Sequence, residues 1–298
     1  MSNYKPKDRG YKSQEQQSPQ MSKEEYRIKK EQERSQAYEK IDEGITHTLE
    51  SPDSFQEYLD IQARLDRYSV ANTILIKEQL STATQLREFK DWSEIGVSVK
   101  RNQKSIMILE PKEYTRQNGS IGVTYAVKRV FDISQTTARP VKKPEKTYEP
   151  AKLISALLET SQIDFDNADS LPDPNAIAFY DSEKNVLLVK EGIGDSTKVF
   201  QAVARELSLA EIAYNSETYD RNEAMFPAVC ASYMLCKKYG VDTADIPIDK
   251  MPAEWAGLEN KDIREKLTMA RDCVNEIGRN LYRELNKKMQ PRVAEHER

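Results

Sequence analysis

The sequence predicts an α+β protein of two domains, in which helices and a small antiparallel sheet precede a mostly helical domain with a short β-hairpin. Its 298 residues suffice for about two domains. Apolar residues recur at helical spacing in both halves, and short β-branched segments bounded by turn residues interrupt them. Residues 137–149 combine two prolines with several charges, which is typical of a linker between domains.

The first 35 residues are predicted to form a disordered or solvated charged arm. Ile28 is the one aliphatic residue in a stretch rich in Gln, Ser, Glu and Lys, so the arm buries too little apolar surface to offset chain entropy. A fraying solvated helix satisfies the same composition. The first domain is placed at residues 36–136.

The first domain is expected to contain three helices and then a small sheet. Ser51-Pro52-Asp53-Ser54 is a helix start signal, and Gly96 suits a helix end because glycine tolerates a left-handed cap. Helices are predicted after residue 51, at 70–80 and at 84–95. Strands, with Asn118-Gly119 as a turn between the last two, are predicted at 97–99, 105–109 and 123–133.

The second domain, residues 150–288, reads as four helices and one hairpin. The hairpin strands are predicted at 176–180 and 185–189. Helices are predicted at 151–160, along the apolar stripe from Phe200 to Tyr214, at 227–239 ending at Gly240, and along the stripe from Ile263 to Leu285. Residues 289–298 form a tail.

Composition limits the compartment and the partners. No stretch approaches the 18 apolar residues of a membrane span and no apolar signal core begins the chain, so we expect a cytoplasmic protein with no membrane partner. Three cysteines are an odd number without CxxC spacing, which indicates reduced, buried thiols. Residues 60–136 carry 12 Lys and Arg against 9 Asp and Glu, whereas residues 151–298 carry 19 against 26. If one half binds nucleic acid, it is the first.

Residues 203–210 (VARELSLA) lie where a zinc peptidase carries His-Glu-x-x-His after a hairpin. This segment and residues 228–242 resemble the peptidase-like C-terminal domain of the ArdC antirestriction family and its LtrC-like relatives. The resemblance implies a zincin-like fold for residues 150–288.

Carried over by position, the resemblance places Arg205 and Leu209 at the two histidines and Val229 at the third ligand. Arginine is permanently cationic, and Leu and Val offer no lone pair to a metal. We therefore expect no metal, no cofactor, no catalytic residue and no enzyme activity of this kind. The catalytic glutamate is retained as Glu206, either as a residual acid or base or as a helix-surface carboxylate paired with Arg205 or a neighbouring helix. Such a domain would serve to pack, dimerise or hold a protein partner through residues 150–288.

Residues 66–111 resemble the N-terminal domain of ArdC-type proteins, and residues 130–136 (VFDISQT) resemble a strand end of the same family. The matched positions are Tyr68, Asn72, Gln79, Ala83, Phe89, Trp92, Gly96, Val99, Lys100, Lys104, Ile106 and Pro111. The resemblance implies binding of single-stranded DNA with weak sequence preference. The sequence departs from the family in the basic turn, where residues 100–105 (KRNQKS) replace Lys-Gly-Glu-Lys-Gly. Asn102 tolerates the positive φ that the lost glycine would supply.

Single-strand binding needs cations for phosphates and aromatic faces for bases. The basic turn supplies Lys100, Arg101 and Lys104, helped by the next strand. The full candidate set is Arg67, Tyr68, Asn72, Lys77, Gln79, Trp92, Lys100, Arg101, Lys104, Lys128 and Arg129.

Each candidate also has a structural interpretation. Trp92 is suited to a core, Asn72 and Gln79 to bridging elements, and the basic turn to a solvated hairpin end. The function that the resemblance implies is a single-stranded-DNA-binding accessory protein of a mobile genetic element, of conjugation or antirestriction type. The alternative is an interaction module or decoy that binds a host defence or conjugation protein without nucleic acid.

Overall fold

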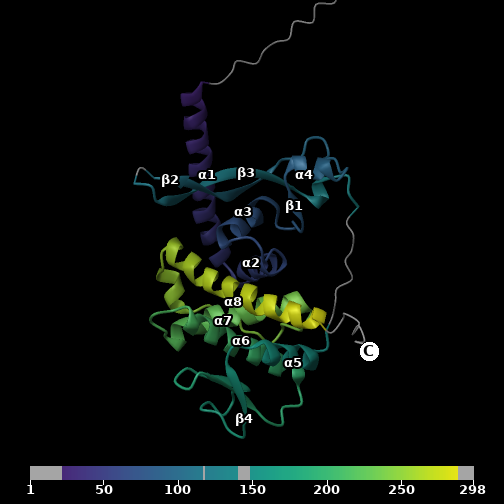
Figure 1. Ribbon diagram of the computed structural model, residues 1–298, viewed down its shortest axis with the longest axis vertical. Coiled ribbons are helices and arrows are strands. Elements are labelled where there is room, and N and C mark those ends of the chain that lie inside the picture. The colour runs from purple at the N-terminus through teal and green to yellow at the C-terminus, as the bar shows by residue number, and fades with distance from the viewer. Residues whose placement is uncertain (1–21, 117, 140–147, 288–298) are drawn as a thin grey trace, which may run out of the picture.

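The computed structural model describes residues 22–116, 118–139 and 148–287, and its two halves are stacked along the long axis (Figure 1). The first half contains four helices, α1 (Lys23–Leu49), α2 (Pro52–Arg64), α3 (Val70–Leu80) and α4 (Phe89–Glu94). Its strands are β1 (Leu86–Arg87), β2 (Ile106–Thr115) and β3 (Ile121–Asp132), followed by the 3-10 turn η1 (Ile133–Gln135).

Side-chain caps fix where the first helices begin. The Ser51 hydroxyl accepts a hydrogen bond from the Ser54 amide and Pro52 occupies the first turn, so α2 starts where its start signal predicted. Ser69 caps α3 in the same way through the Asn72 amide. Gly96 has φ +74°, the left-handed conformation expected after a helix end.

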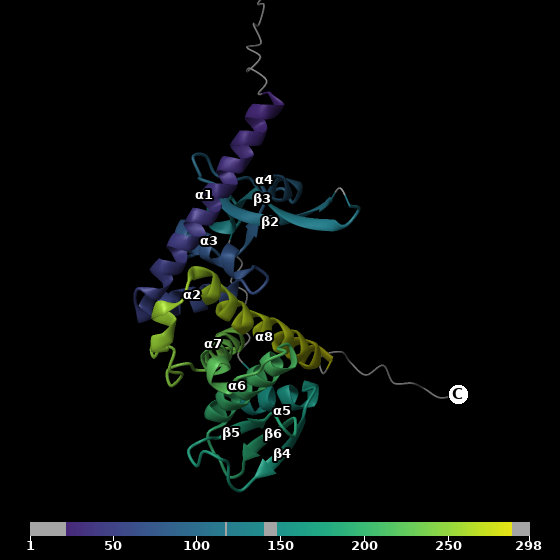
Figure 2. The same ribbon diagram turned by 90° about the vertical axis from the view of Figure 1, so that its left-hand side faces the viewer.

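The first-half sheet has the antiparallel order β1-β3-β2. In the main hairpin Ile106 pairs with Val130 and Leu109 with Val127. Figure 2 shows the far end of this hairpin projecting away from α1. Because β2 is an edge strand, its outer backbone groups need other partners.

The second half places a mixed sheet at one end and packs helices over it (Figure 1). β6 is central, parallel to β4 and antiparallel to β5. α6 contacts β5 and lies against α7 and α8. The elements are α5 (Pro150–Thr160), β4 (Asp164–Ala168), β5 (Ala178–Asp181), β6 (Val186–Lys190), α6 (Ser196–Tyr214), α7 (Arg221–Tyr239), η2 (Ala253–Gly257) and α8 (Asn260–Lys287).

One hydrophobic core joins the two halves. Phe55 of α2 stacks on Phe226 of α7 with ring centroids 5.7 Å apart, and Trp255 packs edge-on against both rings. At the edge of this contact the Tyr233 hydroxyl donates to Asp60 at 2.8 Å. Most buried residues of α1, α2 and α3 therefore belong to the same cluster as those of α6, α7 and α8, while Ile61 and Ile76 pack in a smaller cluster within the first half.

The predicted α+β class is confirmed, with differences in individual elements. Residues 84–95 form β1 and α4 rather than one helix, because Leu86 and Arg87 pair with β3. β4 was not predicted, and α7 begins at Arg221 rather than residue 227 because Asp220 caps it. The three cysteines are buried and unpaired, as predicted.

The boundary drawn at residue 36 falls within α1, whose first turns are exposed. The predictions for residues 1–21, for the linker at 140–147 and for the tail at 289–298 concern parts of the chain outside the described residues. Over the described ranges, no helix combines the length and apolar character that crossing a bilayer requires.

Candidate functional site

The basic turn presents three cations to solvent. Lys100, Arg101 and Lys104 are all exposed, and Asn102 between them has φ 61°, so asparagine supplies the left-handed conformation. The turn therefore keeps a tight shape without glycine.

The strand end at residues 130–136 holds this turn in place. Gln135 donates from Nε2 to the Lys104 carbonyl at 2.7 Å, and its own carbonyl accepts from the Lys100 amide at 2.9 Å. The Lys100 ammonium donates to the Ser134 carbonyl at 2.9 Å. A turn fixed on both sides pays little ordering entropy when it binds a ligand.

Asp132 organises the same strand end from a buried position. Its carboxylate accepts from the amides of Thr84 and Gln85 at 2.7 and 2.8 Å and from the Ser134 amide at 2.8 Å. Burial alone would raise the pKa of Asp132, but these hydrogen bonds together lower it below its ordinary value.

Phe89, one of the positions that match the ArdC family, differs from Trp92 in exposure although both lie on α4. It is 61% exposed, whereas Trp92 is buried with its Nε1 donating to the Phe131 carbonyl at 2.9 Å. The Arg87 guanidinium covers the Trp92 ring at 5.5 Å. Phe89 is the first residue of the short helix α4, and Trp92 is the buried residue of that helix.

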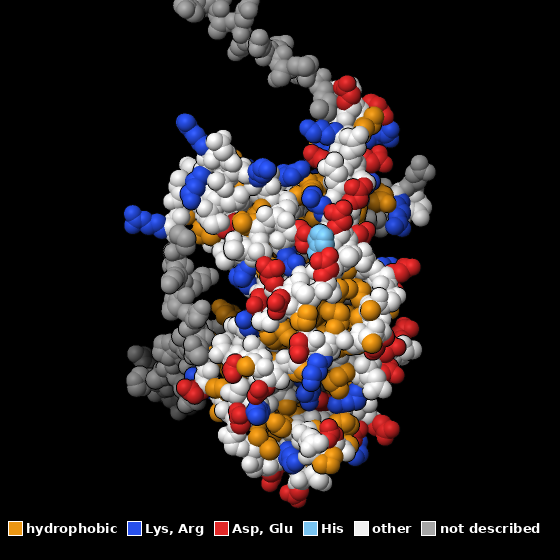
Figure 3. All heavy atoms as spheres, turned by 180° about the vertical axis from the view of Figure 1, so that it is seen from behind, with side chains coloured by type: hydrophobic (Ala, Val, Ile, Leu, Met, Phe, Trp, Pro, Cys, Tyr) orange, Lys and Arg blue, Asp and Glu red, His pale blue; other side chains and the backbone are white. Residues whose placement is uncertain are grey.

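We call the surface that these residues share the turn surface. Seen from behind, this end of the first half shows many Lys and Arg side chains and few carboxylates (Figure 3). The turn surface comprises the exposed residues of the basic turn and of β1 and α4 that attach to the strand end at residues 130–136, where Arg87 pairs with Phe131 and the Phe89 ring contacts the Phe131 ring. These residues are Arg87, Phe89, Lys90, Lys100, Arg101 and Lys104.

Lys128 and Arg129 do not extend the turn surface in the expected way. The Lys128 ammonium lies 2.6 Å from Glu110 and 2.7 Å from Glu88, and these carboxylates raise the pKa of Lys128 above its usual value. Its charge is therefore already balanced within the protein. Arg129, the next residue of the strand, is exposed on the opposite face of the sheet.

Asn72 and Gln79 bind the backbone of β2. The Asn72 amide group donates to the Leu109 carbonyl at 2.8 Å and accepts from its amide at 2.7 Å. Gln79 makes the same pair of bonds with Met107, at 3.0 and 2.8 Å. Two side chains of α3 thus satisfy part of the edge of β2, as a neighbouring strand would.

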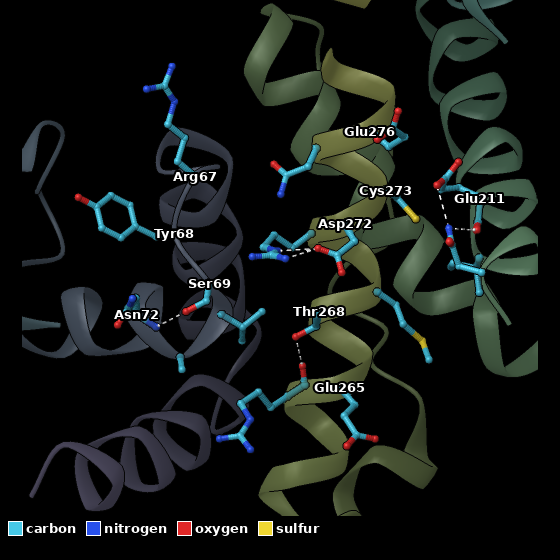
Figure 4. A pocket seen from close by; sticks show the side chains of 18 of the residues that line it. Arg67, Tyr68, Ser69, Asn72, Glu211, Glu265, Thr268, Asp272, Cys273 and Glu276 are labelled. Carbon is cyan, nitrogen blue, oxygen red and sulfur yellow. Dashed lines mark hydrogen bonds and ion pairs between the residues drawn. The ribbon is translucent and has the colours of Figure 1, made fainter. Parts of the chain in front are cut away.

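The remaining candidates lie apart from the turn surface. Arg67 is exposed and Tyr68 is half-buried, and both line a cavity of about 1210 Å³ between the two halves (Figure 4). The Lys77 ammonium lies 3.2 Å from the Ser54 hydroxyl and close to Glu57 and Glu78. The eleven candidates therefore do not form one continuous surface.

The positions of the expected metal ligands are occupied by core and ion-pair residues. Leu209 and Val229 are buried in the hydrophobic core on the packed helices α6 and α7. The guanidinium of Arg205 contacts Glu206 at 3.1 and 3.2 Å. No group of three or more His, Cys, Asp and Glu side chains suited to a metal ion occurs in the part of the chain that the structure describes. His47 contacts Glu78, and His296 lies outside that part.

Glu206 is buried rather than on the helix surface, which corrects one interpretation of the sequence. It is 1% exposed and accepts from the Tyr180 amide at 2.9 Å and from Arg221 at 2.7 Å. With Arg205 on its other oxygen, the carboxylate is engaged on both sides and tied to β5 and α7. The predicted pairing with Arg205 and a neighbouring helix is confirmed.

Comparisons with known proteins agree with this fold. No family model matches the sequence. An uncharacterized protein of Bacillus anthracis is 26% identical over 287 residues, covering 79% of this chain and 48% of the relative. The chain thus spans about half the length of that curated relative.

Two crystal structures of the antirestriction ArdC protein from plasmid R388 are also similar. The metal-free structure gives a TM-score of 0.50 at 16% identity, covering 72% of this chain and 86% of that chain. The Mn(II)-bound structure gives 0.49 at 15% identity, covering 75% and 97%. The resemblance inferred from the sequence motifs is therefore confirmed at the level of the fold, and the chain is similar in fold to the ArdC protein.

Proposed function

We propose that this chain binds single-stranded DNA through the turn surface, as an accessory protein of a mobile genetic element. The observation that carries the proposal is the basic turn itself, whose three cations are exposed on a backbone fixed by Gln135. Phe89 of α4 adds an exposed aromatic face, and its ring contacts Phe131 of the strand end that also holds the turn. Cations with an adjacent aromatic face are what a single strand requires, and they confer little sequence preference.

The fold supports the biological role. The structural neighbour is a plasmid protein described as antirestriction. We infer a related role for this chain, in which binding protects or handles single-stranded DNA during conjugation in the cytoplasm.

Fluorescence anisotropy with labelled single- and double-stranded oligonucleotides at two salt concentrations tests this function. We expect tighter binding to the single strand, loss of affinity with added salt, and weaker binding by a Lys100→Ala, Arg101→Ala, Lys104→Ala variant. A matched control removes three exposed lysines of the second half, Lys152, Lys250 and Lys287, and should bind as the wild type does. Equal loss in both variants would contradict a localised site.

We further propose that the second half is a scaffold without zinc-peptidase activity. Its support is the packing of Leu209 and Val229 in the core and the engagement of Glu206 by two arginines. Metal analysis of the purified protein should find no stoichiometric zinc. Bound zinc that depends on the second half would refute the scaffold role.

Recognition of a protein partner is the second candidate function. Ile121 and Val123 leave apolar side chains exposed near the end of the hairpin, a feature common at protein interfaces. Absence of binding to either oligonucleotide at low salt would favour this candidate.

A further inference from the structure

We propose that tyrosines lining a groove between the two halves stack against bases of a DNA single strand. A second, smaller cavity beside the hairpin adjoins this groove. This inference rests on the proposed function, and it assigns a second contact area away from the turn surface.

The groove is built from elements of both halves. The larger cavity, of about 1210 Å³, lies between α3, β2 and β3 on one side and α6 and α8 on the other. A smaller cavity of about 470 Å³ lies between α1 and β3. Tyr38 and Tyr125 line both cavities, so the two cavities adjoin at these residues.

Three tyrosine rings line these cavities with hydroxyl groups that serve no internal bond. Tyr38 and Tyr125 are 38% and 45% exposed, and Tyr68 is half-buried on the loop before α3. None of the three hydroxyls has a hydrogen-bond partner among the described residues. A tyrosine held in place by its surroundings with its ring exposed in a groove is suited to stacking, because every base has a π-face.

The charges of the groove also suit a phosphate backbone. Arg67 and Arg264 line it from opposite walls, and neither forms an ion pair with a described residue. The acidic side chains of α8 are mostly neutralised, since Asp272 pairs with Arg271 and Glu276 with Arg279.

Two glutamates and the N-terminus of α3 also affect the charge of the groove walls. Glu265 pairs with Lys261, and Glu211 lies on the far side of α8 from Arg67 and Tyr68 (Figure 4). The α3 N-terminus also faces the groove through residues 69–72, and a helix N-terminus favours anions. The carboxylates that line the larger cavity are thus paired with cations except Glu211, while Glu31 lines the smaller cavity without an ion pair to a described residue.

Anisotropy with a single-stranded oligonucleotide of about 20 nucleotides, longer than the usual site of up to about 16, tests this assignment. We expect a Tyr38→Ala, Tyr125→Ala variant to bind about tenfold more weakly or worse, because stacking is lost. A Tyr38→Phe, Tyr125→Phe variant keeps both rings and should bind within about twofold of the wild type. Tyr282→Ala is the matched control, since Tyr282 is 63% exposed on α8 and does not line the groove.

Photocrosslinking of wild-type protein to a 5-bromodeoxyuridine oligonucleotide, with the attached peptides identified by mass spectrometry, locates the strand directly. Crosslinks that include Tyr38, Tyr68 or Tyr125 support the groove. The groove is refuted, while the proposed function stands, under one combined outcome. In that outcome the wild type and the Tyr38→Ala, Tyr125→Ala variant bind equally well, and crosslinks are confined to residues 87–104. Failure of the wild type to bind any single strand refutes both.

Discussion

At position 206 one carboxylate receives hydrogen bonds from a strand and from two helices. The Tyr180 amide, Arg205 and Arg221 together occupy both oxygens. The side chains of Arg205 and Arg221 are 31% and 28% exposed, so their charges are only partly shielded from water. Removing one partner of such a buried ion pair is strongly destabilising, because the remaining charge is left without its partner.

Glu206→Gln should therefore destabilise the protein, by on the order of 3 kcal/mol, because two guanidinium groups lose their counter-charge. Urea unfolding measures the change. Glu217→Gln is the control, since Glu217 is exposed, and it should lie within about 0.5 kcal/mol of the wild type. An unchanged stability for Glu206→Gln would show that the ion pairs are dispensable.

The lowered pKa of Asp132 predicts that this residue makes the free energy of unfolding depend on pH. Its pKa is lower in the folded protein than the ordinary value of 3.8, so its stabilising effect is complete above that value and disappears as the pH falls through the folded pKa. At neutral pH Asp132→Asn should cost about 2 kcal/mol, because hydrogen bonds to a charged acceptor are lost. The difference between variant and wild type should shrink below about pH 4. A difference that is constant from pH 6 to pH 3 would contradict this role for the charge.

At the scale of elements, the hydrogen bonds between α3 and β2 allow a test of whether Asn72 stabilises the fold or contacts DNA. Asn72→Ala leaves the buried amide and carbonyl of Leu109 without partners and should cost about 2 kcal/mol. Binding of single-stranded DNA by the folded variant should be unchanged. Asn222→Ala, at an exposed asparagine in the first turn of α7, is the stability control. Weaker DNA binding with unchanged stability would instead indicate contact with a base.

The elements that the sequence predicted well are those with local signals. α2 and α3 begin at serine caps, and α7 ends at Gly240 with φ +72°. β4 escaped prediction because its sequence, DFDNA, is polar and its residues are mostly exposed, so pairing with β6 alone defines it. The sequence indicates a start of α7 at Pro227 because proline is common in first turns, whereas the helix begins after its cap Asp220 and contains Pro227.

The candidate site was predicted in part for a related reason. The exposed cations of the basic turn follow from residues adjacent in the sequence. The partners of Asn72 and Gln79 lie 37 and 28 residues away, so spacing along one helix could not reveal them. Phe89 and Trp92 are three apart, as core neighbours on a helix are, yet the structure buries Trp92 and exposes Phe89.

At the scale of the whole molecule, the shared core predicts cooperative unfolding. Trp92 and Trp255 are the two tryptophans of the chain, one in each half, and both are buried. The Trp255→Phe variant retains Trp92 as its one tryptophan fluorescence probe, and the Trp92→Phe variant retains Trp255. In urea, the fluorescence transition of each variant should coincide with its own circular-dichroism transition, since the main core contains residues of both halves. Two separated transitions would show independent domains.

The stacking of Phe55 on Phe226 also has an evolutionary consequence. Recombination between related genes exchanges segments, and a crossover between the two halves would join two half-cores that were selected against different neighbours. Such a chimaera would begin with mismatched packing at the centre of the molecule. The two halves are therefore expected to be inherited together, as one unit of selection.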